Sequence, residues 1–416
     1  MQDTPAPEGG ATSVRPPVPS LSPLVTLVLH EEIAPALGET FDRLAEGVLA
    51  LSEQFTRRLA ETAPSYLDDR ALSQAYLAYY LPVNAAKVQA LLDEMPDIDC
   101  AKKAPGDPIR ILELGSGPGT ALLPLLEWYA AASWRTNHPL EVVSVDRSAA
   151  ALATSERLSD RLIRALEIST VTTRRVRADL ERLTPESYCR QGHMGGPYDV
   201  IILANCLGEL FRTARDPIAR KTAFVQRWLG VLAETGTFMI LEPALRPVTR
   251  ALHQVRDGLL RDGVCMVYSP CLHDQRCPAL VKDDDWCHEE RVWTPPDWIP
   301  PIDRRVGFIK DTLKFSYLLL RKDGRTIVPR GPAVFRLVSE LRDMKGEIRV
   351  WACNETGRPE VGRQDRLKRE SNAAMDDCRR GDIVEMEALI GKPAKPGMTR
   401  LLRIPAEGSV RVLRQV

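Results

Sequence analysis

The hydrophobic positions at the start of the chain recur at helical spacing. Apolar residues follow this period from residue 24 to about 95, for example in 75–82 and 85–92. The pattern predicts a helical N-terminal unit over 24–107. Residues 1–23 are rich in Pro, Gly, Ser and Thr and have few large apolar side chains, so burial cannot offset the entropy of ordering them. They are predicted to form a disordered tail.

From residue 109 the pattern changes to short apolar runs that alternate with helical segments. The runs cover 109–114, 141–145, 171–176, 199–203 and 237–241. The segments between them, such as 149–166 and 217–235, are long enough for helices. Strands that alternate with helices form a mainly parallel sheet covered on both faces. The sequence therefore predicts an α/β core over 108–245.

The pattern changes again after residue 245. Residues 246–304 are rich in Pro and Cys and show no sustained period, which indicates an insertion. A strand-like run at 314–321 then suggests that 305–327 returns to the same sheet. Further β-like runs, such as 347–352 and 382–388, predict a small β-rich C-terminal unit over 328–416.

Composition narrows the class of protein. A chain of 416 residues with 44% hydrophobic and 27% charged residues is expected to fold into more than one unit. We find no apolar run long enough to cross a bilayer, so no membrane is expected as a partner. The start of the chain has neither a secretory nor a transit pattern, which predicts a cytoplasmic location. Formal net charge is zero, so overall attraction to nucleic acid is not implied and DNA is not expected as a partner.

A glycine-rich turn, Glu-Leu-Gly-Ser-Gly-Pro-Gly-Thr (113–120), follows the first predicted strand and opens a helix. Gly115, Gly117 and Gly119 let the backbone turn sharply and approach a ligand closely. In a dinucleotide-binding turn the third glycine would come one residue later. The turn therefore predicts a nucleoside ligand other than NAD.

Acidic residues at successive strand ends specify that ligand further. Glu113 would repel a phosphate but suits a ligand with a cationic amino group. Asp146 ends the second strand, where a carboxylate can accept ribose hydroxyls, and Asp179 follows the third strand, where it can meet an adenine amine. This combination predicts a Rossmann-like class I methyltransferase domain that binds S-adenosylmethionine. The predicted binding residues are Glu113, Gly115, Ser116, Gly117, Gly119, Asp146 and Asp179. The alternative is an ordinary tight turn with three solvated acids.

The end of the fourth predicted strand says less about the reaction. Residues 204–210 lack the Asn-Pro-Pro-aromatic pattern that holds an amino group for methylation. Asn205 and Glu209 are the candidate catalytic residues, because they follow the strand at its ligand end. Alternatively, they are a helix cap and a surface acid.

Cysteines gather in the predicted insertion. Nine cysteines in a cytoplasmic chain are not expected to form a disulfide framework. Cys271, Cys277 and Cys287 lie on one loop-like segment, and thiolates on a loop select zinc or an iron–sulfur cluster. The candidates for a fourth ligand are Cys265, Cys353, Cys378, His273 and His288. The absence of a cysteine pair two to four residues apart disfavours zinc. The alternative is a set of unrelated buried cysteines.

Four stretches of this sequence resemble one family, the methyltransferase-like assembly factors of the small ribosomal subunit in bacteria and mitochondria. They are 66–82, 113–120, 269–292 and 314–320, of which the third, Ser-Pro-Cys-Leu-His-Asp-Gln-Arg-Cys-Pro onward, is the most specific. The resemblance implies binding to the small ribosomal subunit and its rRNA during ribosome assembly. It also implies a [4Fe-4S] cluster held by Cys271, Cys277, Cys287 and a later cysteine, best matched by Cys353.

The charge pattern is compatible with RNA binding. Residues 302–330 hold eight Lys and Arg against three Asp, as a phosphate-facing surface would, although a solvated strand would look the same. Trp286, Trp293 and Trp298 could stack on bases or pack around the insertion.

The leading hypothesis is an S-adenosylmethionine-dependent methyltransferase-like protein that acts on or binds small-subunit rRNA during ribosome assembly or translation. The first alternative is a non-catalytic iron–sulfur assembly factor that keeps the methyltransferase fold. The second is a methyltransferase that acts on a small molecule or protein and carries a zinc site.

Overall fold

The computed structural model describes residues 18–38, 40–56, 66–100, 103–104, 106–190, 192, 196–391 and 401–416. They form two compact units. The core unit comprises Val18–Pro270 and Asp274–Ile327, and the C-terminal unit comprises Cys271–His273 and Val328–Val416. Residues 1–17, most of the predicted tail, lie outside the described residues. No helix in these described ranges is long and apolar enough to cross a membrane.

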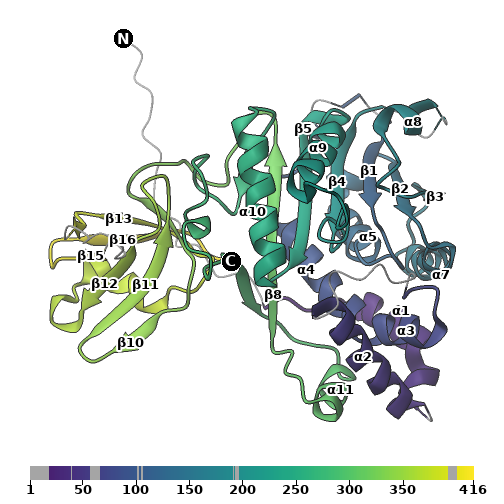
Figure 1. The fold of residues 1–416 in the computed structure, drawn as a ribbon, viewed down its shortest axis with the longest axis horizontal. Coiled ribbons are helices and arrows are strands. Elements are labelled where there is room, and N and C mark those ends of the chain that lie inside the picture. Colours follow the sequence, from purple (N-terminus) through teal and green to yellow (C-terminus); the bar gives the residue numbers. More distant parts are fainter. Residues whose placement is uncertain are drawn as a thin grey trace. The chain divides into compact units, whose positions relative to one another are not determined.

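The core unit is built on one sheet. Its strands are β1 (Ile109–Leu114), β2 (Leu140–Asp146), β3 (Val171–Arg177), β4 (Tyr198–Ala204), β5 (Leu232–Pro243), β6 (Met266–Ser269), β7 (Glu289–Val292) and β8 (Thr312–Arg321). They lie in the order β3-β2-β1-β4-β5-β8-β6, and β7 also pairs with β8 (Figure 1). Strands β1 to β5 are parallel, whereas β8 is antiparallel to β5. This mainly parallel sheet with a late antiparallel strand confirms the predicted Rossmann-like methyltransferase fold class.

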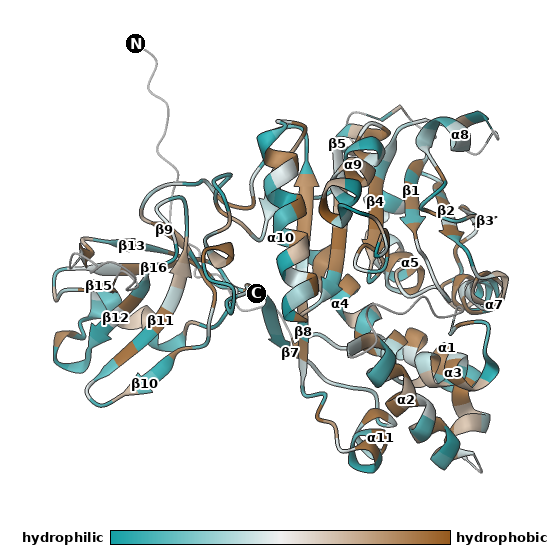
Figure 2. Cartoon of the chain, in the orientation of Figure 1, coloured by the Kyte–Doolittle hydropathy of each residue, from teal (hydrophilic) through white to brown (hydrophobic). Residues whose placement is uncertain are grey.

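Helices cover both faces of this sheet. Helices α4 (Leu81–Glu94), α5 (Leu122–Ala130) and α7 (Ala149–Ala165) pack together behind it, and α9 (Pro217–Leu229) and α10 (Arg246–Arg261) pack in front (Figure 1). The central strands are buried on both sides, so β4 is hydrophobic along nearly its whole length and β8 is hydrophobic over residues 317–320 (Figure 2). Two short helices, α6 (Ser133–Thr136) and α8 (Pro185–Arg190), follow α5 and β3 in the chain.

The N-terminal segment is helical and contains a π-helical turn. Its helices are α1 (Pro23–Leu37), α2 (Phe41–Thr56) and α3 (Arg70–Ala75), followed by the π-helix η1 (Tyr76–Tyr80), which runs into α4. The N–H of Leu81 reaches back to the carbonyl of Tyr76. Pro82 follows and has no N–H to donate, so the chain can leave the regular α-helical register here.

One prediction from periodicity is wrong. Residues 246–261, assigned to a segment without a sustained period, form the amphipathic helix α10. Leu252, Val255 and Leu259 on this helix are buried, but so are His253 and Arg256. Buried polar side chains interrupt the hydrophobic period, which is why the pattern concealed the helix. The later helices of the same predicted insertion are η3 (Pro278–Leu280) and α11 (Ile299–Val306).

The C-terminal unit has its own sheet and core. Its strands are β9 (Val334–Leu337), β10 (Arg342–Met344), β11 (Glu347–Cys353), β12 (Glu360–Gln364), β13 (Ile383–Glu387), β14 (Ile390–Gly391), β15 (Leu401–Arg403) and β16 (Ser409–Arg414), with 3-10 helices η4 (Asp365–Leu367) and η5 (Glu370–Asp377). The order is β14-β15-β12-β11-β9-β13-β16, and β10 pairs with β11. Phe335, Val350 and Val361 belong to a hydrophobic cluster confined to this unit. The finer division of the chain predicted from the sequence, at 107, 245, 304 and 327, stays a proposal.

Candidate functional site

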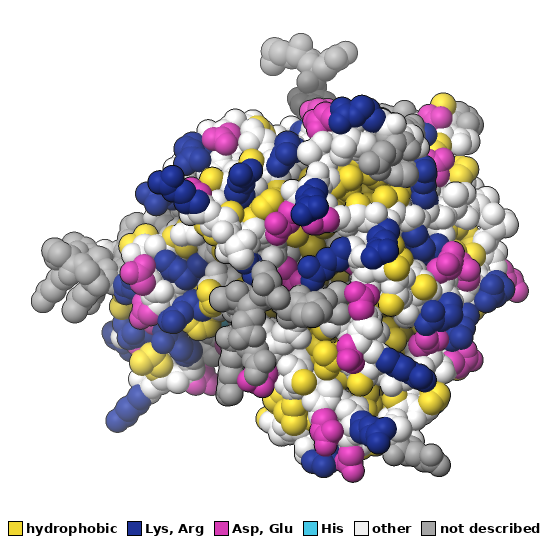
Figure 3. Space-filling model, turned by 45° about the vertical axis from the view of Figure 1, so that its right-hand side comes forward, with side chains coloured by type: hydrophobic (Ala, Val, Ile, Leu, Met, Phe, Trp, Pro, Cys, Tyr) yellow, Lys and Arg dark blue, Asp and Glu magenta, His cyan; other side chains and the backbone are white. Residues whose placement is uncertain are grey.

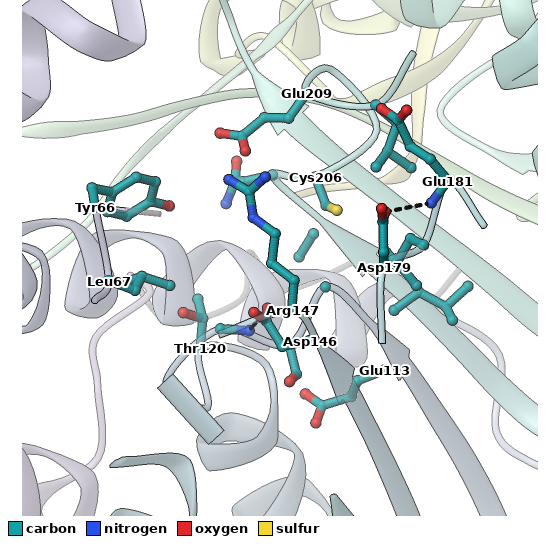
Figure 4. A pocket seen from close by; sticks show the side chains of 18 of the residues that line it. Tyr66, Leu67, Glu113, Thr120, Asp146, Arg147, Asp179, Glu181, Cys206 and Glu209 are labelled. Carbon is teal, nitrogen blue, oxygen red and sulfur yellow. Dashed lines mark hydrogen bonds between the residues drawn. The ribbon is translucent and has the colours of Figure 1, made fainter. Parts of the chain in front are cut away.

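A cavity of about 330 Å³ lies at the carboxyl ends of β1, β2 and β4 (Figure 4). It is at the point where the strand order reverses, which is where open α/β sheets bind ligands. Three regions of the core unit line it. The glycine-rich turn contributes Glu113, Leu114, Gly115, Ser116, Gly117, Thr120 and Ala121. The ends of β2 to β4 and the loops that follow them contribute Asp146, Arg147, Ala178, Asp179, Leu180, Glu181, Ile202, Ala204, Asn205, Cys206, Glu209, Leu210, Arg212 and Thr213. The N-terminal helical segment contributes Gln54, Phe55, Tyr66, Leu67 and Tyr76.

The three glycines of the turn serve different purposes. Gly115 has a φ of 73°, and a Cβ there would lie 2.4 Å from the Cys206 sulfur. Gly119 lies against Ser155 of α7 and does not line the cavity. Gly117 does line it, and a Cβ at this position would meet its nearest atom, from Leu67, only at 3.9 Å. Close approach to a ligand therefore concerns Gly117, whereas Gly115 and Gly119 permit close packing of the protein itself.

Asp146 holds the glycine-rich turn in place. One carboxylate oxygen accepts the N–H of Gly117 at 2.8 Å, and the other accepts the N–H of Ser148 at 2.8 Å. Burial raises the pKa of Asp146, although these two backbone bonds oppose the shift. Each oxygen keeps a lone pair, so the carboxylate that shapes the turn can still accept hydroxyl groups from a ligand.

Glu113 and Ser116 bring buried polar atoms to the cavity. Glu113 is 1% exposed, and one of its oxygens accepts the hydroxyl of Ser144. Its other oxygen, Oε1, and the hydroxyl of Ser116 have no hydrogen-bond partner among the described residues. Burial raises the pKa of Glu113 to about 7. This wall of the cavity is therefore polar and unsatisfied.

Asp179 lines the cavity, and about half of its side chain (51%) is exposed to solvent. Its carboxylate accepts the N–H of Glu181 at 3.0 Å, as the dashed line in Figure 4 shows. Glu181 in turn accepts the N–H of Phe211 at 2.6 Å, which ties the loop after β3 to the loop after β4.

Asn205 and Glu209, the candidate catalytic residues, both line the cavity. Asn205 follows the last residue of β4 in a left-handed conformation with a φ of 52°, and its N–H donates to the carbonyl of Leu241 at 2.7 Å. Both polar atoms of its side-chain amide are buried and have no partner among the described residues. Burial raises the pKa of Glu209, and Arg212 and Arg147 act in the opposite direction. Figure 4 shows Arg147 extending across the cavity toward Glu209.

The lining residues that the sequence analysis missed include Tyr66, Tyr76, Arg147 and Cys206. The Tyr76 hydroxyl lies 3.3 Å from that of Thr120, and the rings of Tyr66 and Tyr76 are 5.6 Å apart. Helical periodicity treats such tyrosines as core residues. The available signal was the family resemblance, since both tyrosines fall in the stretch 66–82.

The four predicted cluster ligands are divided between the two units. Cys271 and Cys353 belong to the C-terminal unit, where the Cys353 sulfur lies 3.7 Å from Nε2 of His273. Cys277 and Cys287 belong to the core unit. Within the described ranges, no group of three or more His, Cys, Asp or Glu side chains is arranged to hold a metal ion. The cluster therefore stays a prediction.

One face of α10 holds the segment that carries Cys277 and Cys287. Arg250 donates to the carbonyls of Ala279, Lys282 and Asp285 at 3.1, 2.6 and 2.7 Å. Three and seven residues further along the helix, His253 lies 3.0 Å from the Cys287 carbonyl and Asp257 accepts the Cys277 N–H at 3.1 Å. Residues at this spacing share a helix face.

Much of the basic stretch 302–330 is engaged within the protein. Arg305, Lys314, Arg321 and Lys322 form ion pairs with Asp42, Glu290, Asp323 and Glu234 respectively. Figure 3 shows both signs of charge interspersed on the face in view. Trp293 and Trp298 are buried, and their indole N–H groups donate to the carbonyls of Lys310 and Ala78. Of the two interpretations, packing is the correct one for these two tryptophans.

The family is decided by a comparison with family models. A model described as mitochondrial small ribosomal subunit Rsm22 matches residues 70–367, which is more than half of the chain. The chain belongs to the Rsm22 family. The resemblance proposed from four sequence stretches is thereby confirmed at the level of the family. The description names mitochondria, whereas the sequence analysis predicted a cytoplasmic location, which stays a prediction for this chain.

Solved structures similar to this Rsm22-family chain include methyltransferases. An O-methyltransferase family protein from Burkholderia thailandensis is 15% identical, with 73% of this chain and 71% of that chain covered and a TM-score of 0.31. A SAM-dependent methyltransferase from Leishmania major is 12% identical, with coverages of 67% and 82% and a TM-score of 0.32. No curated protein sequence matched the chain.

Proposed function

We propose that this Rsm22-family chain binds S-adenosylmethionine in the cavity beside the glycine-rich turn and acts on, or binds, small-subunit rRNA. One observation carries the cofactor assignment. Glu113 Oε1, the Ser116 hydroxyl and the Asn205 amide are buried at this cavity without partners among the described residues. Each such group costs about 1–3 kcal/mol, so a ligand that bonds to them gains affinity.

The chemistry of the lining fits this cofactor. Glu113 offers a buried carboxylate to the amino group of the ligand. Asp146 offers oxygens to the ribose hydroxyls, and Asp179 offers one to the adenine amine. The bound cofactor would supply an activated methyl group. The chain itself would contribute orientation, because alignment of the reacting atoms accounts for much of the rate enhancement in such transfers.

Titration calorimetry of the purified full chain with S-adenosylmethionine and its demethylated product tests the assignment. Gly117→Arg should reduce affinity by about 100-fold or more, because the new side chain enters the cavity and removes several kcal/mol of contacts. Gly263→Arg is the matched control, since Gly263 also has a positive φ and a Cβ at this position would meet no atom within 4 Å. Absence of binding to the wild type would overturn the assignment.

The partner and the reaction rest on the family, whose description names the small ribosomal subunit. Crosslinking the protein to cellular RNA should recover small-subunit rRNA. Methylation of purified small subunits by the wild type, and not by Gly117→Arg, would support an rRNA methyltransferase. Cofactor binding without any transfer would instead favour the non-catalytic assembly factor.

We also propose that Cys271, Cys277, Cys287 and Cys353 hold a [4Fe-4S] cluster with a structural role. The contact between His273 and Cys353 supports Cys353 as the fourth ligand, because it brings the Cys271–His273 segment beside β11 within one unit. The backbone of Cys277 and Cys287 is hydrogen-bonded to side chains of α10, which supports a loop with a fixed conformation. Thiolates are the ligands that such clusters require.

Anaerobic purification with iron and sulfide analysis tests this proposal. Cys271→Ser should lose the visible absorbance and lower stability, whereas Cys100→Ser, at a position outside the ligand set, should keep both. Stoichiometric zinc without sulfide would contradict the cluster and favour the zinc alternative.

A further inference from the structure

The N-terminal helical segment supplies one wall of the cavity, and the proposed cofactor contacts do not use it. Tyr66 and Leu67 line the cavity, and Figure 4 shows them on the opposite side from Asp179. A Cβ on Gly117 would meet Leu67 first, at 3.9 Å, so this wall faces the glycine-rich turn. A nucleoside bound against the turn would therefore lie between the two. The role inferred for this wall rests on the proposed function.

Aromatic packing holds this wall in place. The ring of Tyr66 lies 5.1 Å from that of Phe55 and 5.6 Å from that of Tyr76, in edge-to-face and tilted arrangements. Leu67 is buried beside them. The wall is therefore largely apolar, whereas the wall formed by the glycine-rich turn carries polar atoms without partners among the described residues. Because a nucleoside has apolar faces and polar edges, two such walls can enclose it.

One hydrogen bond joins this wall to the loop after β2. The Ser148 hydroxyl donates to Oδ1 of Asp68 at 2.5 Å, although the two residues are 80 positions apart in the sequence. The same hydroxyl accepts the N–H of Ala151 at 3.0 Å, as the N-cap of α7. The Ser148 N–H donates to Asp146 at 2.8 Å. Asp68 therefore contacts the residue that holds the carboxylate assigned to the ribose hydroxyls.

The neighbouring acid shows that this contact is not a local cap. Asp69 accepts the N–H of Leu72 at 2.9 Å and so caps α3, the helix that it precedes. Asp68 has no hydrogen bond or ion pair within the described part of the chain other than the one with Ser148. Its side chain reaches from an exposed turn to a serine that is 1% exposed. The contact therefore links the helical segment to the sheet and does not stabilise the turn that carries it.

Other contacts anchor the helical segment independently of Asp68. Glu32 of α1 pairs with Arg157 and Arg161 of α7 at 2.9 and 3.1 Å. Loss of the Asp68 contact should therefore release residues 66–68 without detaching α1 from α7.

We propose that residues 66–68 form a strap that completes the cofactor site. Tyr66 and Leu67 cover the bound nucleoside on the side opposite the glycine-rich turn. Asp68 does not line the cavity and is a positioning residue, since it fastens the strap to the loop that presents Asp146. The strap must open before the cofactor leaves, so the contact between Asp68 and Ser148 slows dissociation.

Dissociation of the demethylated cofactor, measured by surface plasmon resonance on the immobilised full chain, tests the strap. Asp68→Ala should release this ligand about tenfold faster than the wild type, because a hydrogen bond to a charged group no longer holds the strap closed. Asp68→Asn should dissociate within about threefold of the wild-type rate, since its Oδ1 still accepts the Ser148 hydroxyl. Equal acceleration by the two variants would overturn the strap, because only the charge would then matter.

A double-mutant cycle isolates the contact. Ser148→Ala removes the other partner, and Asp68→Ala should have no further effect on dissociation in that background. Fully additive effects of the two substitutions, or unchanged dissociation in Asp68→Ala alone, would contradict the proposal.

Leu67→Ala tests the covering wall itself and should also speed dissociation. The matched control is Leu72→Ala, at a partly buried leucine of the same segment that does not line the cavity, and it should leave the rate unchanged. Equal effects of these two variants would also overturn the strap. In each of these cases the wild type still binds the cofactor, so the cofactor assignment survives. Failure of the wild type to bind would overturn both proposals together.

Discussion

The cavity and the cysteine-bearing segment show two ways in which the core unit holds a local structure in place. At the cavity, backbone packing sets the geometry: Gly115 lies against Cys206, and the N–H of Gly117 is bonded to Asp146. Side chains that line the cavity keep polar atoms that have no partner among the described residues. In the cysteine-bearing segment, 275–287, the reverse holds. Its backbone carbonyls are taken up by side chains from one helix, as the contacts of Arg250 illustrate.

This difference determines what each region tolerates. A turn held by close backbone packing depends on residues within the motif itself. A segment held by the side chains of α10 depends on residues that lie outside it in the sequence. The first should therefore fail through steric clash and the second through loss of hydrogen bonds.

Gly115→Ala should have the largest effect on stability. The positive φ costs about 1–2 kcal/mol for alanine, and insertion of a methyl group 2.4 Å from the Cys206 sulfur adds about 1–3 kcal/mol of overpacking. Urea unfolding measures the sum.

Gly263→Ala is the matched control for this change. Its φ is 67°, close to that of Gly115, but a Cβ there would have no neighbour within 4 Å. Gly263→Ala should lower the free energy of unfolding only by the cost of a positive φ at alanine. Equal destabilisation by the two variants would mean that close packing does not define the cavity end of the sheet.

Arg250→Ala should have the next largest effect and should act locally. The guanidinium donates to three carbonyls, and hydrogen bonds to charged groups contribute about 1.5–3 kcal/mol each, with losses that do not add fully. We expect the amides of 275–287 to exchange with solvent about 100-fold faster, as measured by hydrogen exchange.

Arg261→Ala provides the comparison on the same helix. Its side chain is 78% exposed and pairs with Asp262, so its loss should leave exchange in 275–287 unchanged. If Arg250→Ala left the exchange unchanged as well, the segment would owe its structure to something other than α10.

The same contrast explains what the sequence could predict. The run 109–114 coincides with β1, and the run 171–176 differs from β3 by one residue. Buried parallel strands such as β4 read as nearly continuous apolar segments. The glycine-rich turn and the acids after each strand were recognisable because motif and context lie together in the chain. Helix α10 could not be recognised in the same way. Its buried His253 and Arg256 make hydrogen-bond contacts with backbone carbonyls of residues that come later in the chain.

The residues of the candidate site could be predicted only in part from the sequence, for a related reason. Asn205 and Glu209 follow a predicted strand, so position alone made them candidates. Tyr66 and Tyr76 reach the cavity from the helical segment that precedes the sheet, and no local pattern indicates that route. Their contribution depends on the π-helical turn at Tyr76–Tyr80 and on the packing of the helical segment, which periodicity does not specify.

The smallest expected effect is on the pH dependence of cofactor affinity. It distinguishes a buried carboxylate that lines the cavity, Glu113, from a buried carboxylate that does not. Burial raises the pKa of Glu113 to about 7. The group is therefore mostly protonated at pH 6 and mostly ionised at pH 8. Because its pKa is above that in the unfolded chain, its contribution to stability is present below about pH 4.5 and is lost as the pH rises through 7.

A ligand with a cationic amino group reverses that preference, because it binds the ionised form. Affinity for the demethylated cofactor, measured by calorimetry, should rise about tenfold between pH 6 and pH 8, and Glu113→Gln should abolish the rise. Burial also raises the pKa of Glu242 to about 7, but this residue bonds to the N–H of Gly208 and does not line the cavity. Glu242→Gln should therefore keep the rise. The affinity should follow the ionisation of the carboxylate that contacts the ligand. If the rise in affinity with pH vanished in Glu242→Gln and persisted in Glu113→Gln, Glu113 would not be part of the cofactor site.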